Sequence, residues 1–410
     1  MNGTAAKLVL LGSLYLAQGL PHGFFATAMP ALLRKQGVSL TEIGLSMVVM
    51  LSWGLKFLWA PVVDRFGSAR FGHRRSWIVP LQLGAIVGFV ALAHVDVLRG
   101  MPVLMLGMAA VILLLATQDI AVDGLAVALL RPEERGLGNG VQVAAYRLGM
   151  IVSGGVLMIY SAELGWSGVF YAMAGMVALA TLPILFIREP DAPRPERVVW
   201  GAFREFVRLP AMGTWFLVLV VFKFGESFAV SMLRPHLTDL GVTLQQLGWI
   251  NGTVGALAGL VGALIGGWLV GRFGRWRMLL GFAGVQALAV ASYALLPMPG
   301  EALDMRLVYG LCVTEYLSSG MASVALFTLM MDSARPHVAG SDYTIQASTV
   351  VLASGLAGGL SGVSADAFGF TVHYLIAAGL AALAIPAILL HRMRVGLGVS
   401  GASSMVIAGG

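Results

Sequence analysis

Long apolar runs alternate with short charged segments along the whole chain. A run of about 20 residues in a helix rising 1.5 Å per residue crosses roughly 30 Å of hydrocarbon. The pattern predicts twelve such helices, at 7–33, 40–61, 77–95, 102–130, 139–161, 166–188, 211–236, 244–270, 277–297, 304–332, 342–365 and 369–391. A polar stretch with four prolines, 189–210, separates the first six from the last six and is typical of a linker. We therefore predict two six-helix bundles, 1–188 and 211–391, and a tail, 392–410, rich in Gly, Ser and Ala.

Two short strings recur about half a chain length apart. The string Asp64–Gly67 returns as Gly271–Gly274, and the string Arg131–Gly136 returns as Arg335–Gly340. Repeats at this spacing indicate two homologous halves. Both strings lie in charged breaks between apolar runs, where a transporter built from two parallel repeats would place its hairpins.

Composition excludes a water-soluble globular protein. Hydrophobic residues make up 58% of the chain and charged residues only 11%, which is too few to cover a core of this size. The fold class predicted is an all-α membrane protein.

The single cysteine, Cys312, excludes an internal disulfide and a cysteine zinc site, and we expect it to be a small buried hydrophobe. The first apolar run is too long for a secretory signal core, so we predict that it is a retained span.

The positive charges predict the orientation. If the N-terminus is cytoplasmic, eighteen of the 26 Lys and Arg residues fall in inside segments and five in outside loops. Both termini are therefore predicted to be cytoplasmic. The calculated pI of 9.7 follows from this topology and is not a sign of nucleic-acid binding.

Three strings in the first half carry a family resemblance. They are Leu55–Arg65 (LKFLWAPVVDR), Gln118–Asp123 (QDIAVD), and Glu134–Gly136 followed by Tyr146–Gly149 (ERG and YRLG). With twelve spans in two halves, the chain resembles the AmpG-like branch of the major facilitator superfamily. That branch covers muropeptide permeases, acetyl-coenzyme A transporters and RhtX/FptX-type siderophore permeases. The resemblance implies a transporter of the bacterial inner membrane that works by alternating access around a central cavity.

The sequence leaves several classes of transported solute as alternatives. Muropeptide permeases of this branch tend to carry extra C-terminal spans, whereas the siderophore permeases that resemble this chain are compact. That difference favours import of a ferric siderophore or a similar amphiphilic chelate from periplasm to cytoplasm. An anhydromuropeptide is the alternative, followed by an acyl-coenzyme A or a drug-like solute. A phosphate-binding Gly-x-x-x-x-Gly-Lys-Ser/Thr motif is absent, so the energy is expected to come from an ion gradient, from the solute's own gradient or from a separate subunit, with proton coupling preferred.

Ionisable side chains inside predicted spans are functional candidates because each is costly in hydrocarbon. In the first half these are Lys56, Asp119, Asp123 and Arg147. Asp119 and Asp123 share a helix face at i, i+4. Counting residues from the helix ends puts Arg147 level with Asp123 and Lys56 similarly deep, so the two cations are expected to neutralise the two carboxylates. We therefore predict an Asp123–Arg147 pair. The cluster is either a structural lock or a substrate- or proton-binding site in which Gln118 assists Asp119.

The second half offers Lys223, Glu226 and Glu315. A carboxylate in a low-dielectric cavity can load and release a proton as access alternates, so Glu226 and Glu315 are candidate proton carriers, with Asp119 as a third. Lys223 and Glu226, at i, i+3, could equally contact a charged solute or form a purely structural pair.

Other polar and aromatic groups are candidate solute contacts. The complete predicted substrate-binding set is Tyr15, Gln18, His22, Trp53, Gln118, Asp119, Tyr146, Lys223, Asn251, Tyr316 and Gln346. In the repeated hairpins, Asp64, Arg65 and Arg272 are predicted to bridge helix ends as a gate.

Enzyme, metal and receptor functions are not predicted. The seven histidines lack metal-ligand or acid-base spacing, and the sequence predicts no large extramembrane signalling domain. We expect no cofactor and no catalytic residue, and a monomer whose partners are a small solute, protons and the bilayer.

Overall fold

The computed structural model describes residues 3–29, 32–33, 51–68, 70–96, 100–186, 189, 200–298 and 300–407. These residues fold almost entirely into helices. In the first half the elements are α1 (Thr4–Gly23), the π-helix η1 (Phe24–Ala28), α4 (Leu51–Leu55), the 3₁₀ turn η3 (Lys56–Leu58), α5 (Ala60–Arg65), α6 (Arg75–Leu92), α7 (Met101–Leu129), α8 (Arg135–Ile151), the π-helix η4 (Val152–Val156), α9 (Leu157–Ile159) and α10 (Ser161–Leu185).

The second half begins with a short helix and continues with long ones. Its elements are α11 (Ala202–Arg208), α12 (Met212–Asp239), α13 (Leu244–Gly248), the π-helix η5 (Trp249–Val254), α14 (Gly255–Phe273), α15 (Arg275–Ser292), the 3₁₀ turns η6 (Tyr293–Leu295) and η7 (Pro336–Val338), α16 (Met305–Ser333), α17 (Ala339–Ala382) and α18 (Ala384–Ile407).

Most predicted helices coincide with observed ones, with two differences. The predicted span 40–61 lies within the described residues only from 51 onward, where η3 interrupts the helix and α5 continues it to Arg65. The predicted tail from 392 is helical as far as Ile407, because α18 runs through it. Within the described residues, nine segments are long and apolar enough to cross a membrane, and the last of them, Pro336–Val395, is a 60-residue run.

Two glycines with positive φ break helices at corresponding places in the two halves. Gly165 lies inside α10 with φ 65°, and Gly369 lies inside α17 with φ 75°. They are 204 positions apart, the same displacement as between Arg131 and Arg335. A residue with a side chain is disfavoured at positive φ, so these glycines extend the internal duplication beyond the two strings.

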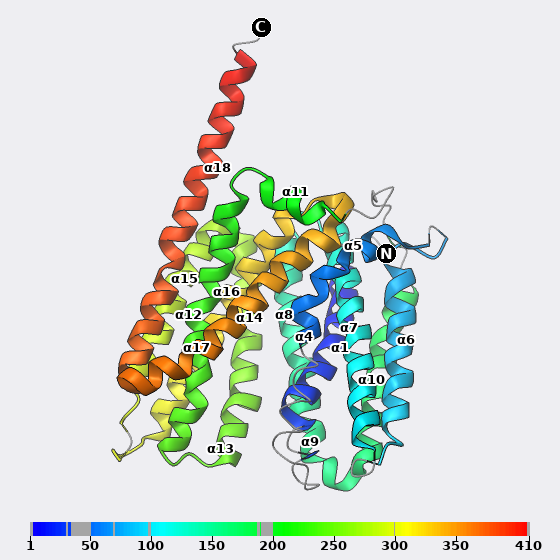
Figure 1. Cartoon of the computed structure of the whole chain (residues 1–410), viewed down its shortest axis with the longest axis vertical. Coiled ribbons are helices and arrows are strands. Elements are labelled where there is room, and N and C mark those ends of the chain that lie inside the picture. The colour runs from blue at the N-terminus through cyan, green and yellow to red at the C-terminus, as the bar shows by residue number, and fades with distance from the viewer. Residues whose placement is uncertain are drawn as a thin grey trace.

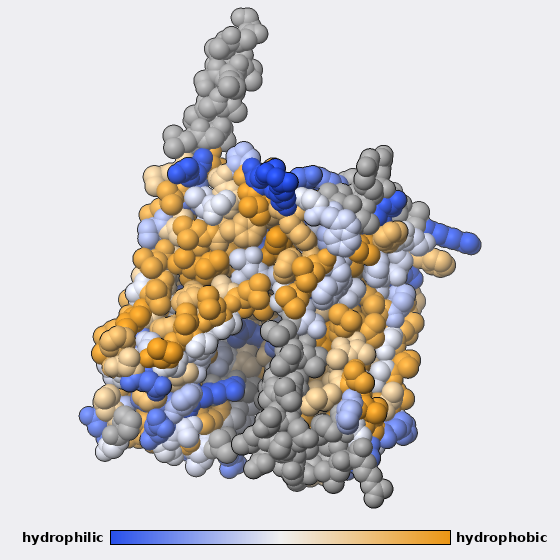
Figure 2. All heavy atoms as spheres, in the orientation of Figure 1, coloured by the Kyte–Doolittle hydropathy of each residue, from blue (hydrophilic) through white to orange (hydrophobic). Residues whose placement is uncertain are grey.

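The halves lie side by side. Figure 1 shows the blue-to-teal helices of the first half on one side and the green-to-red helices of the second half on the other, with α17 crossing diagonally between α12 and the first half and α18 returning along α12. Figure 2 shows hydrophobic side chains across the middle of the molecule and hydrophilic ones gathered at its two ends. Many of these outward-facing hydrophobic residues are exposed, among them Leu106, Leu179 and Leu288, as expected of a surface that lies in lipid.

Glycines bring the two halves into backbone contact at one end. The first turns of α8 pack along α14, where a Cβ on Gly267 would lie 2.9 Å from the carbonyl oxygen of Gly136 and 3.1 Å from Cα of Gly140. Small residues at helix crossings in membranes permit this close approach. A side chain here would push the halves apart.

Within the second half, Gly262 of α14 makes the corresponding contact with α16. A Cβ on Gly262 would lie 2.1 Å from the backbone oxygen of Leu317, so Gly262→Ala is expected to lower the midpoint of thermal unfolding by several degrees. The control is Gly281→Ala on the exposed face of α15, where no atom lies within 4 Å of the added Cβ and the change should be neutral or stabilising. Equal midpoints for the two variants would contradict the packing.

Candidate functional site

A cavity of about 1670 Å³ lies between the halves. Its walls come from α1, α4, α7 and α8 on one side and from α12, α14, α16 and α17 on the other. The lining continues to Asp239 and Gln245, at the end of the molecule that carries α13, which we call the open end. Figure 2 shows the surface hollowed between the halves toward that end. The opposite end, which carries α5 and α11, is the closed end.

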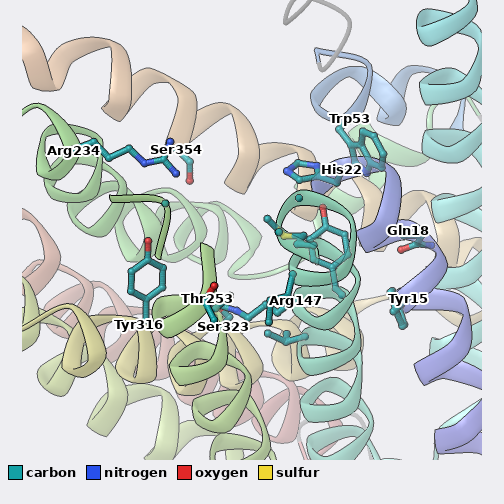
Figure 3. Close-up of a pocket in the computed structure, with 18 of the residues that line it drawn as sticks. Tyr15, Gln18, His22, Trp53, Arg147, Arg234, Thr253, Tyr316, Ser323 and Ser354 are labelled. Carbon is teal, nitrogen blue, oxygen red and sulfur yellow. The ribbon is translucent and has the colours of Figure 1, made fainter. Parts of the chain in front are cut away.

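Eleven of the residues singled out from the sequence line this cavity. They are Tyr15, Gln18, His22, Trp53, Lys56, Asp119, Asp123, Tyr146, Arg147, Lys223 and Tyr316. Figure 3 shows His22 and Trp53 close together on one wall and Tyr316 on the opposite one. The His22 ring lies 5.6 Å from both the Trp53 and the Tyr146 ring centroids, so α1, α4 and α8 together form an aromatic corner of the cavity.

Lys56 is the centre of the first-half charge cluster. It forms an ion pair with Asp119, and its Nζ lies 3.5 Å from Oδ2 of Asp123. The Tyr15 hydroxyl donates a 2.8 Å hydrogen bond to Asp123. The lysine side chain is only 3% exposed, so this cation is held in place by two carboxylates from successive turns of α7. The 3₁₀ turn η3, which begins at Lys56, interrupts the helix at this point.

The predicted Asp123–Arg147 pair is wrong. Arg147 extends toward the second half, where its Nη2 donates to Ser319 Oγ at 3.4 Å, and its guanidinium lies over Gly259 of α14. The number of residues from a helix end does not determine which way a side chain points around its helix. The expected neutralisation by Lys56 is seen, since it pairs with Asp119 and its Nζ lies 3.5 Å from Asp123.

A second polar network lies on the wall formed by α12 and α16. Lys223 Nζ is 2.7 Å from Glu226 Oε2 and donates to Ser323 at 2.9 Å, and Ser319 donates to Glu226 Oε1 at 2.6 Å. The Lys223–Glu226 pair considered from the sequence is therefore present. Because Arg147 also donates to Ser319, this hydroxyl joins the first half to the Glu226 carboxylate.

Glu315 lies behind the cavity wall. It is 1% exposed and accepts hydrogen bonds from Gln286 Nε2 at 3.1 Å and from the Tyr293 hydroxyl at 3.4 Å. Among the described residues no Lys or Arg forms an ion pair with it. Its chain neighbour Tyr316 lines the cavity, so this carboxyl group is one residue removed from the open space.

Three predicted solute contacts do not line the cavity or cannot be placed. Gln118 is fully buried inside the first half. Gln346 is buried toward the closed end, where its Oε1 accepts hydrogen bonds from Trp215 and Ser333. The side chain of Asn251 lies outside the described residues. For Gln118 and Gln346 the structure thus assigns interior packing positions, because their helix faces point into a bundle.

The closed end is held by polar links between the halves. Asp64 accepts hydrogen bonds from the backbone N–H groups of Gly340, at 3.1 Å, and Ser341, at 2.6 Å, at the start of α17. Arg74 Nη2 donates to Asp64 at 2.6 Å. A carboxylate at a helix N-terminus satisfies orphan N–H groups and is favoured by the helix dipole. The predicted bridging by Asp64 is therefore seen.

The predicted bridging by Arg65 and Arg272 is not. The guanidinium of Arg65 stacks over Phe66, and Arg272 is exposed. Arg275 forms a bridge between the halves instead. It pairs with Asp332 and donates to the Pro132 carbonyl oxygen at 2.6 Å.

Asp332, at the end of α16, joins three segments. It pairs with Arg275 and with Arg135 Nη1, the latter at 2.8 Å. Arg135 belongs to the first half and Arg275 to the second, so one carboxylate holds two cations that would otherwise repel each other across the interface.

Copies of the repeated strings pack against each other. Asp64, in the first copy of one string, contacts Gly340, in the second copy of the other. In the reverse pairing, Gly136 lies against Gly271, where a Cβ on Gly136 would be 3.2 Å from the Gly271 nitrogen. Gly271 stands where Asp64 stands in the first copy, so the second contact has no carboxylate of its own, and Asp332 supplies one.

Several residues of the closed end and the cavity were not predicted from the sequence. They are Arg74, Arg135, Arg234, Arg275, Ser319, Ser323, Asp332 and Tyr343. Arg135 lies within one repeated string, Arg275 directly follows another and Asp332 is three residues before a third, and this proximity was an available signal. The serines gave none, because a serine in a membrane helix commonly bonds its own backbone.

At the closed end a further cluster joins the first turn of α1 to the start of α8. Arg131, Lys7 and Thr4 all donate to the Glu134 carboxylate, with Lys7 Nζ at 2.7 Å. These hydrogen bonds hold the pKa of Glu134 well below its usual range. Because the folded pKa is depressed, the stabilisation is complete at neutral pH and is lost as the pH falls below the ordinary range of a glutamate.

Curated proteins of similar sequence cover nearly the whole chain. An anhydromuropeptide permease of Escherichia coli (strain K12) is 30% identical over 396 residues, which is 94% of this chain and 78% of that protein. A protein named putative transporter AmpG 4 of Rickettsia felis is 24% identical over 360 residues, with 84% of this chain and 85% of that protein covered.

The fold also matches solved transporters. The MFS transporter FucP in its outward conformation superposes with a TM-score of 0.72 at 14% identity, covering 94% of this chain and 98% of that one. At this identity the match shows the fold alone. Residues 11–358, most of the chain, match the Major Facilitator Superfamily. A duplicated helical protein with a cavity between its halves, similar along its length to AmpG-type permeases, is thus a member of the Major Facilitator Superfamily and a membrane transporter.

Proposed function

We propose that this protein is a secondary transporter of the bacterial inner membrane that imports an anhydromuropeptide by alternating access. One observation carries the mechanism: the cavity is accessible at one end of the molecule and sealed at the other by links between the halves. The solute class is supported by the 30% identity to an anhydromuropeptide permease over 94% of the chain. A cavity of about 1670 Å³ is large enough for a glycopeptide of this kind.

The ferric siderophore that the compact length favoured finds no support among the similar curated proteins. The chain matches the muropeptide permease over 78% of that protein's length, so the twelve predicted helices correspond to its shared part, and chain length was a poor guide to solute. We therefore replace siderophore import with the muropeptide alternative.

In the proposed topology the chain has twelve spans, arranged as two six-helix bundles, with both termini in the cytoplasm. The inside excess of Lys and Arg supports this orientation. It places the closed end, with Arg74, Arg135 and Arg275, on the cytoplasmic side and the open end on the periplasmic side. The structure then corresponds to an outward-facing state. We expect the transporter to act as a monomer, since each chain has its own cavity.

Proton coupling is assigned to Glu315, with Glu226 and Asp119 as further carriers. Glu315 is buried without a cationic partner among the described residues, so it can be neutral or charged without breaking an ion pair. Glu226 and Asp119 are each paired with a lysine, so a change in their protonation would alter a network that reaches the cavity.

Uptake by proteoliposomes tests both the solute and the coupling. Labelled anhydromuropeptide should accumulate when an inward proton gradient is imposed, and a ferric siderophore should not. Glu315→Gln should abolish gradient-driven accumulation and preserve exchange at equal pH, because the amide mimics the protonated acid and cannot release a proton. Glu163→Gln, on the exposed first turn of α10, is the matched control. Siderophore accumulation without muropeptide accumulation would overturn the proposal.

A further inference from the structure

The positive charges of the cavity fall into two classes. Lys56 is balanced by Asp119 and Asp123, and Lys223 is balanced by Glu226. The charge of each lysine is therefore already neutralised by carboxylates of the protein. The cavity also contains two arginines, Arg147 and Arg234, that are not balanced in this way.

No carboxylate of the described residues forms an ion pair with Arg147 or Arg234. Arg147 makes only a long 3.4 Å hydrogen bond to Ser319. Asp239 lies in the same cavity lining, five residues after Arg234 on α12, but does not pair with it. Figure 3 shows both side chains reaching across the cavity, with Thr253 and Ser323 beside Arg147 and Ser354 beside Arg234. An unpaired guanidinium in a membrane protein is costly unless it meets water or an anion.

The wall formed by α1 and α4 has no such excess of positive charge and contains unsatisfied polar atoms. Gln18 is 1% exposed and its Nε2 has no hydrogen-bond partner, and Nδ1 of His22 is also without one. Both residues line the cavity beside the aromatic corner formed with Trp53. Buried polar atoms left unpaired cost free energy, so this wall is suited to a neutral ligand with hydroxyl and amide groups and an apolar ring face.

From this division we propose that Arg147 and Arg234 are the specificity residues for the carboxylates of the solute. Gln18 and two residues of the aromatic corner, His22 and Trp53, then contact its neutral sugar portion. The proposal rests on the proposed function, since a muropeptide combines an uncharged, amide-bearing sugar with carboxylates. A guanidinium forms two parallel, charge-assisted hydrogen bonds with a carboxylate, and an amide offers no matching negative charge. The cavity therefore selects acids over their amides.

The test compares two probes in one purified protein. One is an anhydromuramyl tripeptide with free carboxylates, and the other is the same compound with every carboxyl group converted to carboxamide. Titration calorimetry should show the wild type binding the acid at least roughly tenfold more tightly. Arg147→Gln and Arg234→Gln should each reduce that ratio, and the double variant should bring it close to one. The ratio of the two affinities within one variant is insensitive to a partial loss of folded protein.

Two further variants sharpen the result. Arg306→Gln removes an exposed guanidinium at the start of α16, outside the cavity lining, and should keep the wild-type ratio. Arg147→Lys keeps the charge but loses the forked geometry, and should give an intermediate ratio. Equal wild-type affinity for both probes, no binding of the acid, or an unchanged ratio in the double variant would overturn the anion site.

Failure of the proposed function gives a different pattern. A wild type that binds the acid selectively but never accumulates it in proteoliposomes is not a muropeptide importer, yet retains the anion site. A wild type that accumulates acid and amide equally is an importer in which the two arginines do not select the carboxylates.

Discussion

Replacing Lys56 with methionine will eliminate transport and markedly destabilise the protein. The change leaves Asp119 and Asp123 facing each other at successive turns of α7 without a cation. Removing one partner of a buried ion pair costs roughly 3–5 kcal/mol, and here two carboxylates lose the same partner. Asp123→Asn should cost less, because Lys56 retains Asp119.

Thermal unfolding in detergent and proteoliposome uptake measure the two effects. Arg70→Met, on an exposed loop residue, is the matched loss of a cation. If the unbalanced carboxylates are the cause, adding Asp119→Asn and Asp123→Asn to Lys56→Met should restore most of the unfolding midpoint. A Lys56→Met protein as stable as Arg70→Met, or no recovery in the triple variant, would show that Lys56 is not the central cation of this cluster.

Asp332→Asn will shift the protein away from the closed arrangement seen here. The asparagine leaves Arg135 of the first half and Arg275 of the second half facing each other without a carboxylate between them. Because this link exists only when the closed end is shut, its loss should favour the opposite state of the two-state gate. We expect transport to fall roughly 10- to 100-fold, corresponding to about 1.4–2.8 kcal/mol.

The shift can be measured as a distance. Spin labels at Glu133→Cys and Phe273→Cys, two exposed positions near Arg135 and Arg275, should show a larger population of long distances in Asp332→Asn than in the parent. Asp304→Asn is the control, since Asp304 caps the other end of the same helix, α16. Unchanged distances in Asp332→Asn, with transport lost, would mean that Asp332 acts on something other than the closed end.

The errors in predicting the charge pairs share one physical cause. Counting residues from a helix end gives the depth of a side chain, because the rise per residue is constant. It does not give the direction of the side chain around the bundle, which depends on how each helix is rotated against its neighbours. Lys56 and Arg147 were placed at similar depth, but Lys56 faces α7 and Arg147 faces the second half. The i, i+3 spacing of Lys223 and Glu226 was a better guide because both residues lie on one helix.

The predicted gate residues show a related limit: a sequence repeat locates the contact between the halves but does not identify the side chains that make it. The repeated strings correctly identified where the two halves meet, and Asp64 bridges there. Arg272 was chosen because it matched Arg65 in the repeat, yet Arg275, three residues later at the start of α15, makes the contact. The duplication preserved the backbone positions of the hairpins more closely than the side chains that link them, as the replacement of Asp64 by Gly271 also shows.

The sequence by itself determined the membrane-embedded helical class, the internal duplication and the set of charged residues inside the apolar runs. These properties follow from apolar run length, local spacing and the cost of charge in hydrocarbon, all of which act along one helix at a time. Only the tertiary structure decided which charges are balanced, which end is shut and which two arginines remain available in the cavity. Those outcomes depend on contacts between helices far apart in the chain, since an ion pair requires its two groups to lie within about 4 Å, whatever their separation in sequence.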